Sequence, residues 1–455
     1  MSDLSPIGGG DELLALARRV LGDAGGGEQV EVFAARSRSV RVDAHGGAVE
    51  SLSVAESAGV GVRCIVDGRQ GFAHCGTLDE ASVRATLAEA RDNARFAEVD
   101  PWAGLAEPDG VSPVMPPFNP EAIGALGVDD KVAMAVALER AASSADPRVT
   151  GVRVAAYADH VGEVAIVSTT GIEALSRDAS AGLSVSALAN DDTMTTVGGW
   201  GDAARDPRDL DVDAVAGVAV DRAVRMLGAG PIPSTRLAVV FEPRQATTLL
   251  NLLVGTLSGV AVVKGRSLFA DRVGETIASP LLTLVDDPTD PRSLAADSHD
   301  GEGLACRPTA LVEGGVLQGF LHNTWTARRL GTASTASASR GYRSTPGVSS
   351  GAVVTAAGSG TRDELIAGVT HGLLVQSISG VHSGVNMVSG DVSVGVEGLL
   401  ITDGEIGPPV REVTLASTLQ RMLLGISAVG ADVEWLPGGM AVPTIVVGEM
   451  ALGGR

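Results

Sequence analysis

Three kinds of residue are scarce in this sequence: aromatic residues, lysine and cysteine. Aromatic residues make up 3% of the 455 positions and hydrophobic residues 45%, so the cores have to be built from Val, Leu, Ile and Ala. Only two lysines occur, and the net charge is −21. A protein that neutralises nucleic-acid phosphates or anionic lipids needs clustered Lys and Arg. The composition therefore argues against nucleic-acid and membrane partners.

The few cysteines and the lack of long apolar runs bear on location. Three cysteines without regular spacing favour reduced thiols over a disulfide framework. The first residues lack the basic and apolar regions of a secretory signal. The longest apolar run, near residues 249–263, is interrupted by polar residues and is too short to span a bilayer. These features predict a cytoplasmic protein.

The first half of the chain alternates between strand-like and helix-like segments. Apolar residues repeat with a period of two in several stretches, such as residues 60–66, and Asp67-Gly68 is typical of a hairpin turn. Helices are predicted over residues 12–21, 80–96, 131–144 and 211–227. We therefore predict an N-terminal α+β domain over residues 1–230, built as an antiparallel sheet with helices. A proline-rich connector at residues 101–120 marks a possible sub-boundary.

A second domain, over residues 231–455, is predicted to follow the glycine- and proline-rich segment 228–234. Its pattern is mostly that of strands, with hairpin turns at Glu313-Gly314-Gly315 and Asp403-Gly404. The predicted fold class is thus α+β, with a mostly β C-terminal domain.

Three local predictions concern the connections within this second domain. A helix is predicted from Pro243 to Ser258. Another is capped by Thr361 and predicted to end at Gly372. The Ser-, Thr-, Ala- and Gly-rich residues 331–350 predict a mobile loop.

The seven histidines form no recognisable zinc motif. A catalytic zinc needs about three protein ligands, and the usual signature is two His about one helical turn apart with a Glu beside the first. No His precedes a Glu here, and the closest pair is His371 and His382. These histidines are interpreted as surface or loop residues, with His371 suited to a helix C-terminus.

Two further patterns are interpreted as structural. His74 and Cys75 are adjacent on a predicted strand and therefore point to opposite faces. Residues 347–351 match Gly-x-Ser-x-Gly, but a nucleophile elbow needs a strand before it and a helix after it. Here residues 352–355 predict a strand instead.

Charged residues around the predicted loop are the candidates for binding. Asp300 and Glu302 can meet Asp286-Asp287 in space and hold a cation or order the loop, although Asx turns explain such acids more commonly. Arg340 and Arg343 beside the loop suit a peptide carboxylate. A structural salt bridge remains the alternative for both arginines.

Several segments, in a fixed order, resemble the TldD/PmbA family and its PmbA (TldE) branch in particular. The resemblance covers most of the chain and is strongest after Leu237. The segments are residues 61–73, 267–269, 286–288, 300–303, 311–321, 327–331, 371–375, 384–398 and 443–447. Asn386, in the segment 384–398, is counted with Asp300, Glu302, Arg340 and Arg343 as a candidate peptide-binding or cavity residue.

The resemblance implies a zinc peptidase made of two related chains, of which one carries the metal. The TldD-type subunit has His-Glu-x-x-x-His on a helix and a distant Cys as third ligand. The comparable segment here, residues 246–259, has neither His nor Glu, and no Cys follows Cys306. The resemblance therefore implies a TldE-like subunit with no catalytic residue and no metal of its own. Zinc is expected on its partner, a TldD-like paralogue, in a heterodimer.

The substrates implied by the resemblance are unfolded or short peptides, including leader peptides of ribosomally made natural products. This chain would supply cavity wall and a peptide groove. Other functions remain open at this point. The chain is alternatively a stand-alone peptide-binding module, or a peptidase with its own site assembled from distant residues. Recruitment to one natural-product pathway is a third alternative.

Overall fold

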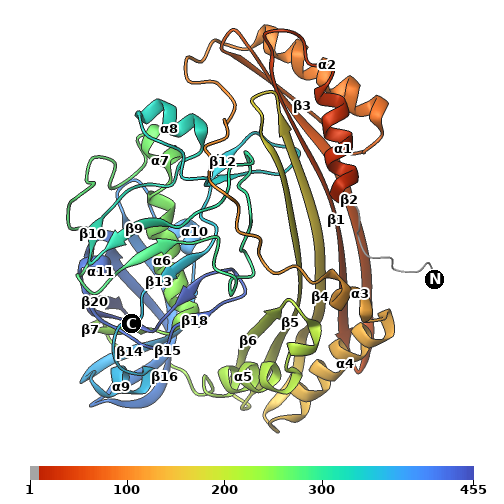
Figure 1. The fold of residues 1–455 in the computed structure, drawn as a ribbon. Helices are drawn as coiled ribbons and strands as arrows, with labels where there is room; N and C mark the ends of the chain where they lie inside the picture. Colours follow the sequence, from red (N-terminus) through yellow and green to blue (C-terminus); the bar gives the residue numbers. More distant parts are fainter. Residues whose placement is uncertain (1–9, 455) are drawn as a thin grey trace.

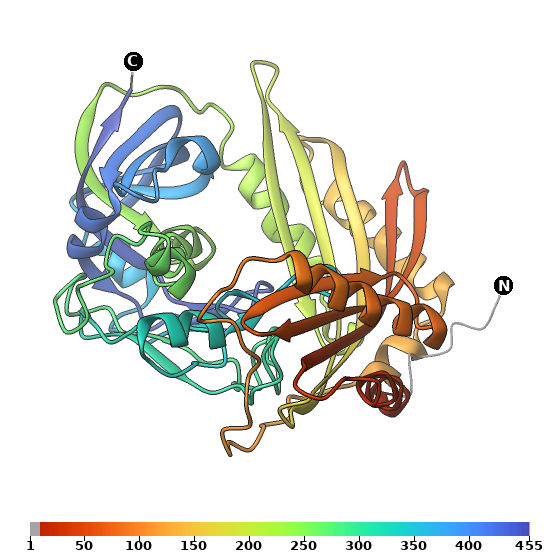
Figure 2. The same ribbon diagram turned by 90° about the horizontal axis from the view of Figure 1, so that it is seen from above.

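A computed structural model describes residues 10–454 and shows two halves that lie side by side (Figures 1 and 2). The N-terminal half contains one six-stranded antiparallel sheet, here called the long sheet, with strand order β3-β2-β1-β4-β5-β6. Its strands are β1 (Gln29–His45), β2 (Ala48–Val66), β3 (Arg69–Cys75), β4 (Val149–Ser168), β5 (Glu173–Asn190) and β6 (Thr195–Ala204). Its helices are α1 (Gly10–Leu21), α2 (Glu80–Phe96), α3 (Pro120–Ala125), α4 (Val128–Ser144) and α5 (Val212–Val224), with a short 3-10 helix at Pro207–Asp209.

The long sheet owes its form to alternating residues and tight turns. Gly46 and Gly47 join β1 to β2, and Asp67 and Gly68 join β2 to β3, all four with positive φ angles. Two-residue turns of this kind match the twist of antiparallel strands. The turn predicted at Asp67-Gly68 is therefore confirmed.

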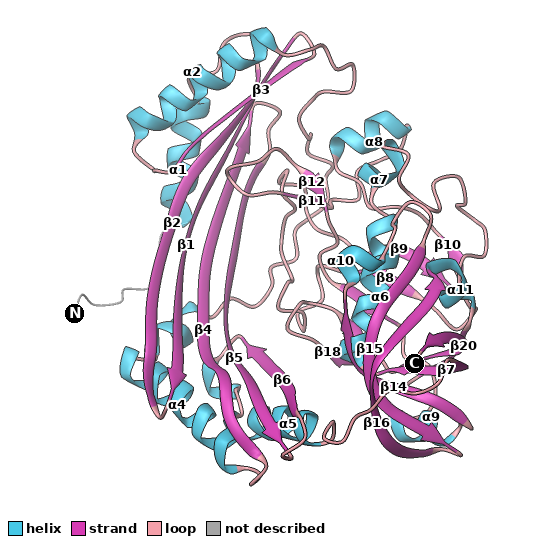
Figure 3. Cartoon of the chain, turned by 180° about the vertical axis from the view of Figure 1, so that it is seen from behind, coloured by secondary structure: helices cyan, strands magenta, loops and turns pink. Residues whose placement is uncertain are grey.

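The two faces of the long sheet have different neighbours. Val30, Val32 and Ala34 of β1 belong to a core that also contains residues of α1 and α2. Further along the same face, Val40 and Val42 pack with residues of α4 and α5. Figure 3 shows α1, α2 and α4 on the side of the sheet away from the C-terminal half. The alternate residues of β1, beginning with Glu31, therefore face the C-terminal half.

The C-terminal half contains two six-stranded sheets and a two-stranded one, β11-β12. The first six-stranded sheet has the order β16-β15-β14-β7-β20-β17 and the second β10-β9-β8-β13-β19-β18. The strands of the first are β7 (Thr235–Phe241), β14 (His371–Ser379), β15 (Asp391–Thr402), β16 (Glu405–Thr418), β17 (Ile426–Val429) and β20 (Ile445–Gly453). Those of the second are β8 (Leu284–Asp286), β9 (Thr309–Glu313), β10 (Val316–Leu317), β13 (Val353–Thr355), β18 (Glu434–Trp435) and β19 (Ala441–Val442), and the small pair is β11 (Ala338–Ser339) and β12 (Gly347–Val348).

One helix lies at the centre of this half. The helices are α6 (Pro243–Thr256), α7 (Gly259–Val263), α8 (Thr324–Leu330), α9 (Arg362–Ala367), α10 (Val381–Gly384) and α11 (Leu419–Leu424). Leu249, Leu250 and Leu253 of α6 belong to one buried core together with residues of both six-stranded sheets. The α+β class is confirmed, with an antiparallel N-terminal sheet and a β-rich C-terminal region. No helix among residues 10–454 is long and apolar enough to cross a membrane.

Three local predictions differ from the structure. The helix capped by Thr361 ends at Ala367, because residues from His371 onward pair with β15 as strand β14. The helix over residues 80–96 was predicted to be capped by Thr77 in a capping box with Glu80, but the side chain that caps α2 is Asp79, which accepts a hydrogen bond from the Ser82 N–H at 2.9 Å. Residues 331–350, predicted as one mobile loop, contain the paired strands β11 and β12, and Ala338 is buried.

Candidate functional site

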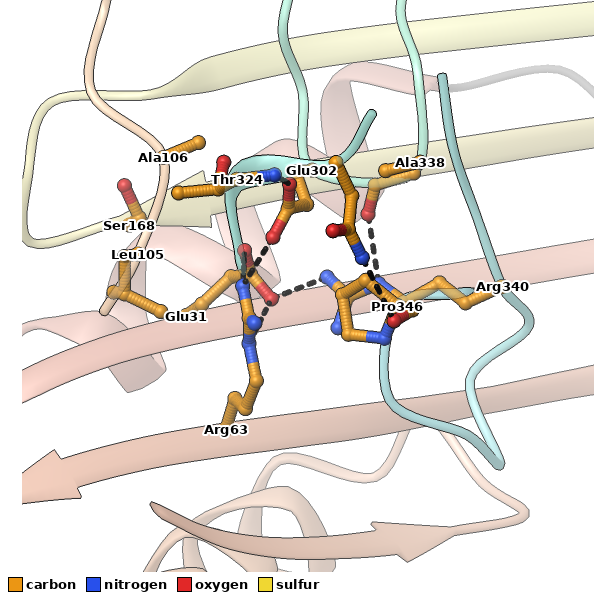
Figure 4. Close-up of polar contacts among 12 residues, drawn as sticks. Glu31, Arg63, Leu105, Ala106, Ser168, Glu302, Thr324, Ala338, Arg340 and Pro346 are labelled. Atoms are coloured by element: carbon orange, nitrogen blue, oxygen red, sulfur yellow. Dashed lines mark hydrogen bonds and ion pairs between the residues drawn. The ribbon is translucent and has the colours of Figure 1, made fainter. Parts of the chain in front are cut away.

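Four buried charged side chains join the two halves, and they are called the charge cluster below (Figure 4). Arg63 of β2 donates to both carboxylate oxygens of Glu31 on β1, at 3.1 and 2.8 Å. The same guanidinium reaches Glu302 in the C-terminal half at 3.3 Å. Arg340, which follows β11, bonds to Glu31 in turn and donates through Nε to the Gly301 carbonyl at 2.8 Å. The cluster thus ties the long sheet to two segments of the C-terminal half.

The charge cluster is electrically balanced. Burial alone would raise the pKa of Glu31, but Arg340 and Arg63 outweigh it and lower that pKa. Burial opposes the charge of Arg63, yet Glu31 and Glu302 raise its pKa. At Arg340 burial outweighs the nearby carboxylates and lowers the pKa. Two carboxylates thus face two guanidiniums, and the cluster forms an ion-paired joint between the halves.

Acids of the 300–302 loop organise the backbone around the joint. The Asp300 carboxylate accepts from the Glu302, Leu304 and Ala338 N–H groups at 2.9 to 3.0 Å. Glu302 accepts from the Thr324 N–H at the start of α8, at 2.8 Å. The prediction that these acids could order the loop thus matches contacts that they make.

A cavity of about 200 Å³, here called the aspartate cavity, lies beside the charge cluster. Three carboxyl groups line it: those of Asp286 and Asp300, which are buried, and that of Asp297, which is half-buried. Burial raises the pKa of Asp286 to about 6, although the Gly351 and Ala352 N–H groups oppose the shift. Burial raises the pKa of Asp297, and burial with the nearby Glu302 raises that of Asp300. Further negative charge on the walls of the aspartate cavity is therefore unfavourable.

Asp286→Asn is expected to flatten the pH dependence of stability between about pH 4 and pH 6. The folded chain holds the Asp286 proton more tightly than the unfolded chain, so this carboxyl's contribution is full below about pH 4 and declines as the pH rises through about 6. The Asn oxygen can still accept from Gly351 and Ala352. Urea unfolding at pH 4, 5, 6 and 7 measures the slope. Asp363→Asn, at an exposed carboxyl, is the control, and equal slopes for wild type and Asp286→Asn would contradict the assignment.

A second cavity, of about 420 Å³ and here called the helix cavity, is lined by one face of α6. Arg244, Thr247 and Asn251 stand three and four residues apart and line it. The Arg244 guanidinium donates to the Gly201 carbonyl at 2.9 Å and lies over the Trp200 ring, and the Thr247 hydroxyl donates to the Arg244 carbonyl. The helix cavity and the aspartate cavity share the wall formed by residues 349–351. The two cavities therefore adjoin.

The face of α6 that lines the helix cavity does not fit a zinc ion. Zinc is held by Cys sulfur, His nitrogen or carboxylate oxygen, and Arg244, Thr247 and Asn251 offer none of these. Elsewhere, His322 is buried and within 3.2 Å of the Thr326 hydroxyl. His160 lies between Ser39 and Asp178, at 3.0 and 3.3 Å.

The structure brings together three of the five predicted site residues. Asp300, Glu302 and Arg340 meet at the charge cluster and the aspartate cavity. Arg343 instead donates to the Tyr342 hydroxyl at 2.8 Å on an exposed turn. Asn386 is exposed and accepts from the Val388 N–H at 2.9 Å, which closes a turn. The guanidinium of Arg340 is bound by Glu31, so it makes the salt bridge that the sequence left open as an alternative.

Sequence reasoning did not single out Glu31 and Arg63. Both alternate with apolar residues on their strands, a pattern typical of a solvent-facing side. Their partners are about 240 to 310 residues further along the chain. The only local signal of their burial is that Glu31 and Arg63, which have opposite charges, face each other in the β1–β2 register.

Comparison with known proteins gives a consistent result along the chain. Three family models match: PmbA/TldA metallopeptidase domain 1 over residues 30–94, the central domain over residues 121–227 and the C-terminal domain over residues 234–454. Metalloprotease PmbA of Escherichia coli O157:H7 is 26% identical over 443 residues, which are 95% of this chain and 94% of the relative. A metalloprotease TldD homolog of Haemophilus influenzae is 28% identical over 424 residues, 87% and 86% of the two chains.

The fold has a close counterpart among solved structures. The structure of TldE from Thermococcus kodakarensis superposes with a TM-score of 0.87 at 26% identity. The match covers 98% of this chain and 99% of that one. The likeness therefore extends over both halves and is not confined to one sheet.

Proposed function

This chain belongs to the PmbA/TldD metallopeptidase family, and from that premise we propose that it is the subunit of a two-chain zinc peptidase that does not hold the metal. The observation that carries the proposal is the face of α6. In the TldD-type subunit the comparable helix is expected to supply two His ligands and a Glu. In this chain it presents Arg244, Thr247 and Asn251 to the helix cavity. None of these three side chains is a zinc ligand.

The proposed partner is a zinc-bearing, TldD-like paralogue. Relatives named PmbA and relatives named TldD both align with most of this chain, which is compatible with two related subunits of one fold. The cytoplasm is the proposed location, which suits three cysteines that are all free in the structure.

The proposed substrates are unfolded or short peptides. The adjoining cavities of about 200 and 420 Å³ are of a size for a few side chains and not for a folded domain. The Asn251 amide, and the Arg244 nitrogens that do not bond to Gly201, can hydrogen-bond peptide groups with little regard for sequence. This chain would thus supply cavity wall and groove, and the paralogue the reacting centre.

The test is the zinc content of the purified chain, alone and co-expressed with the His-Glu-x-x-x-His paralogue of the same organism. We expect no zinc on the lone chain and about one zinc per pair, with peptidase activity in the pair only. Near-stoichiometric zinc and activity on the lone chain would contradict the proposal and favour a site of its own. Peptide binding by a chain that never associates with the paralogue would favour a stand-alone binding module.

A further inference from the structure

The long sheet has an edge that lacks a partner strand over residues 51–57. Strand β2 pairs with β1 over nearly its whole length, from Ala48 to Ile65. Strand β3 covers only the stretch from Val60 to Val66 on the other side. Within residues 10–454, no strand pairs with the outer side of residues 51–57. Such an edge displays backbone N–H and C=O groups that can pair with another chain.

Apolar side chains accompany this edge. Leu52 lies opposite Val42 and Val54 opposite Val40, and both valines of β1 are buried against α4 and its neighbours. Opposite residues in an antiparallel pair share a face, so the apolar stripe of the core continues outward to β2. There Leu52 and Val54 are 45% and 46% exposed. A further strand would cover both side chains.

The edge faces away from the cavities. In Figures 1 and 2 the β1–β2 hairpin lies on the side of the molecule opposite the C-terminal half. The aspartate and helix cavities are lined mainly by residues of the C-terminal half. A chain approaching from outside can therefore reach the edge without entering the cavities.

A second copy of this chain fits the edge poorly. Antiparallel self-pairing about Leu52 sets Glu50 against Val54, and self-pairing about Val54 sets Glu56 against Leu52, so each places an acid opposite an apolar side chain. Self-pairing about Ser53 instead sets Leu52 against Val54. The same register sets Glu50 against Glu56 at both ends of the pairing, and like charges opposite one another destabilise a sheet. Glu50 also forms a β-bulge, because no residue of β1 pairs with it between Asp43 and Ala44. The bulge further disturbs the regular pairing that a second copy would need. The net charge of −21 adds repulsion between copies.

We propose that residues 51–57 of β2 form a docking edge for a strand of the partner subunit. The strand that fits alternates apolar residues, which cover Leu52 and Val54, and carries Lys or Arg opposite Glu56 and Glu50. This inference rests on the proposed two-chain function, since it assigns part of the surface through which the chains associate. Backbone pairing supplies the attraction, and the flanking charges select the partner over a second copy.

The experiment compares the wild type with the double variant Leu52→Lys/Val54→Lys, each mixed with the zinc-bearing paralogue. Exposed lysines on an edge oppose strand addition. We expect association at least about ten-fold weaker by analytical ultracentrifugation, with an unchanged melting temperature for the lone variant. The matched control is Val273→Lys/Leu281→Lys, at two exposed apolar positions of the C-terminal half. In the wild-type pair, amide hydrogen exchange of residues 51–57 should slow relative to the lone chain.

The outcomes separate the edge from the function. One outcome is that the wild type and the lysine variant bind the paralogue equally well and that amide exchange of residues 51–57 does not change on binding. In that case the docking edge is wrong and the proposed two-chain function stands. If the wild type does not bind the paralogue, the function fails and the edge with it. Concentration-dependent protection of residues 51–57 in the lone chain would identify a second copy as occupant. Protection that appears only on adding an unfolded peptide, oxidised insulin B chain, would identify substrate, and either result overturns the proposal.

Discussion

Arg63→Met is expected to lower the free energy of unfolding by about 3–5 kcal/mol, the scale for removing one partner of a buried ion pair. The Arg63 side chain is 3% exposed and carries the charge that both Glu31 and Glu302 face. Methionine preserves much of the volume but leaves Glu302 without a cationic partner in the charge cluster. Because Glu302 also holds the start of α8, we expect the junction of the two halves to loosen. Urea unfolding and limited proteolysis measure the two effects.

A matched surface variant and a second substitution make this prediction specific. Arg19→Met removes an ion pair with Glu80 in which both side chains are about half exposed, and it should lower the free energy of unfolding far less than Arg63→Met does. Glu302→Gln in the Arg63→Met background removes the unpaired charge and keeps an oxygen for the Thr324 N–H, so it should restore part of the loss. If the single Arg63→Met variant were as stable as the Arg19→Met variant, the charge cluster would not stabilise the junction of the two halves.

Local sequence signals predicted the elements that local contacts determine. The Asp67-Gly68 turn joins β2 and β3 as expected, since both residues take positive φ angles there. The predicted helix over residues 80–96 coincides with α2, whose apolar face packs on the long sheet. The helix from Pro243 is α6, with proline in its first turn.

Predictions that depended on distant contacts were less accurate. Gly368 directly follows Ala367 and is the C-cap of α9, a local signal that the prediction passed over in favour of Gly372. The strand β14, which pairs with β7 and β15, then begins at His371. Residues 331–350 are small and polar, which is typical of a loop. The burial of Ala336 among them depends on the long sheet, because Ala336 packs in one core with Phe33 of β1 and Ile166 of β4.

The candidate site shows the same division. Asp300 and Glu302 could be named because acids and glycines gather in one short segment. Their partners could not, since Glu31 and Arg63 occupy strand positions that are exposed in a sheet covered on one face only. The C-terminal half covers part of the second face of the long sheet, at Glu31 and Phe33, and no sequence pattern indicates that contact. The burial of Glu31 and Arg63 therefore follows from the packing of the two halves and not from the sequence of their strands.

Removal of zinc from the two-chain complex is expected to lower kcat/KM for an unfolded peptide by about a thousand-fold or more. A metal that polarises a carbonyl and activates water supplies several kcal/mol of transition-state stabilisation, and each 1.4 kcal/mol is a factor of about ten. The loss should be restored by adding one equivalent of zinc per pair. Dialysis against a chelator, followed by zinc titration with activity and metal content read together, measures it.

In the same complex, Gln at each of the seven histidines of this chain should leave kcat/KM within a few-fold of wild type and the zinc content at about one per pair. His322 is the demanding case, since it is buried and contacts the Thr326 hydroxyl, so its variant is expected to lose stability rather than zinc. Gln at either His of the paralogue's His-Glu-x-x-x-His helix is the matched positive control and should reproduce the effect of chelation. If a histidine variant of this chain remained folded but lost both zinc and activity, the zinc site would have to be assigned to this subunit. The face of α6 argues for the opposite result, because Arg244, Thr247 and Asn251, which line the helix cavity, include no zinc ligand.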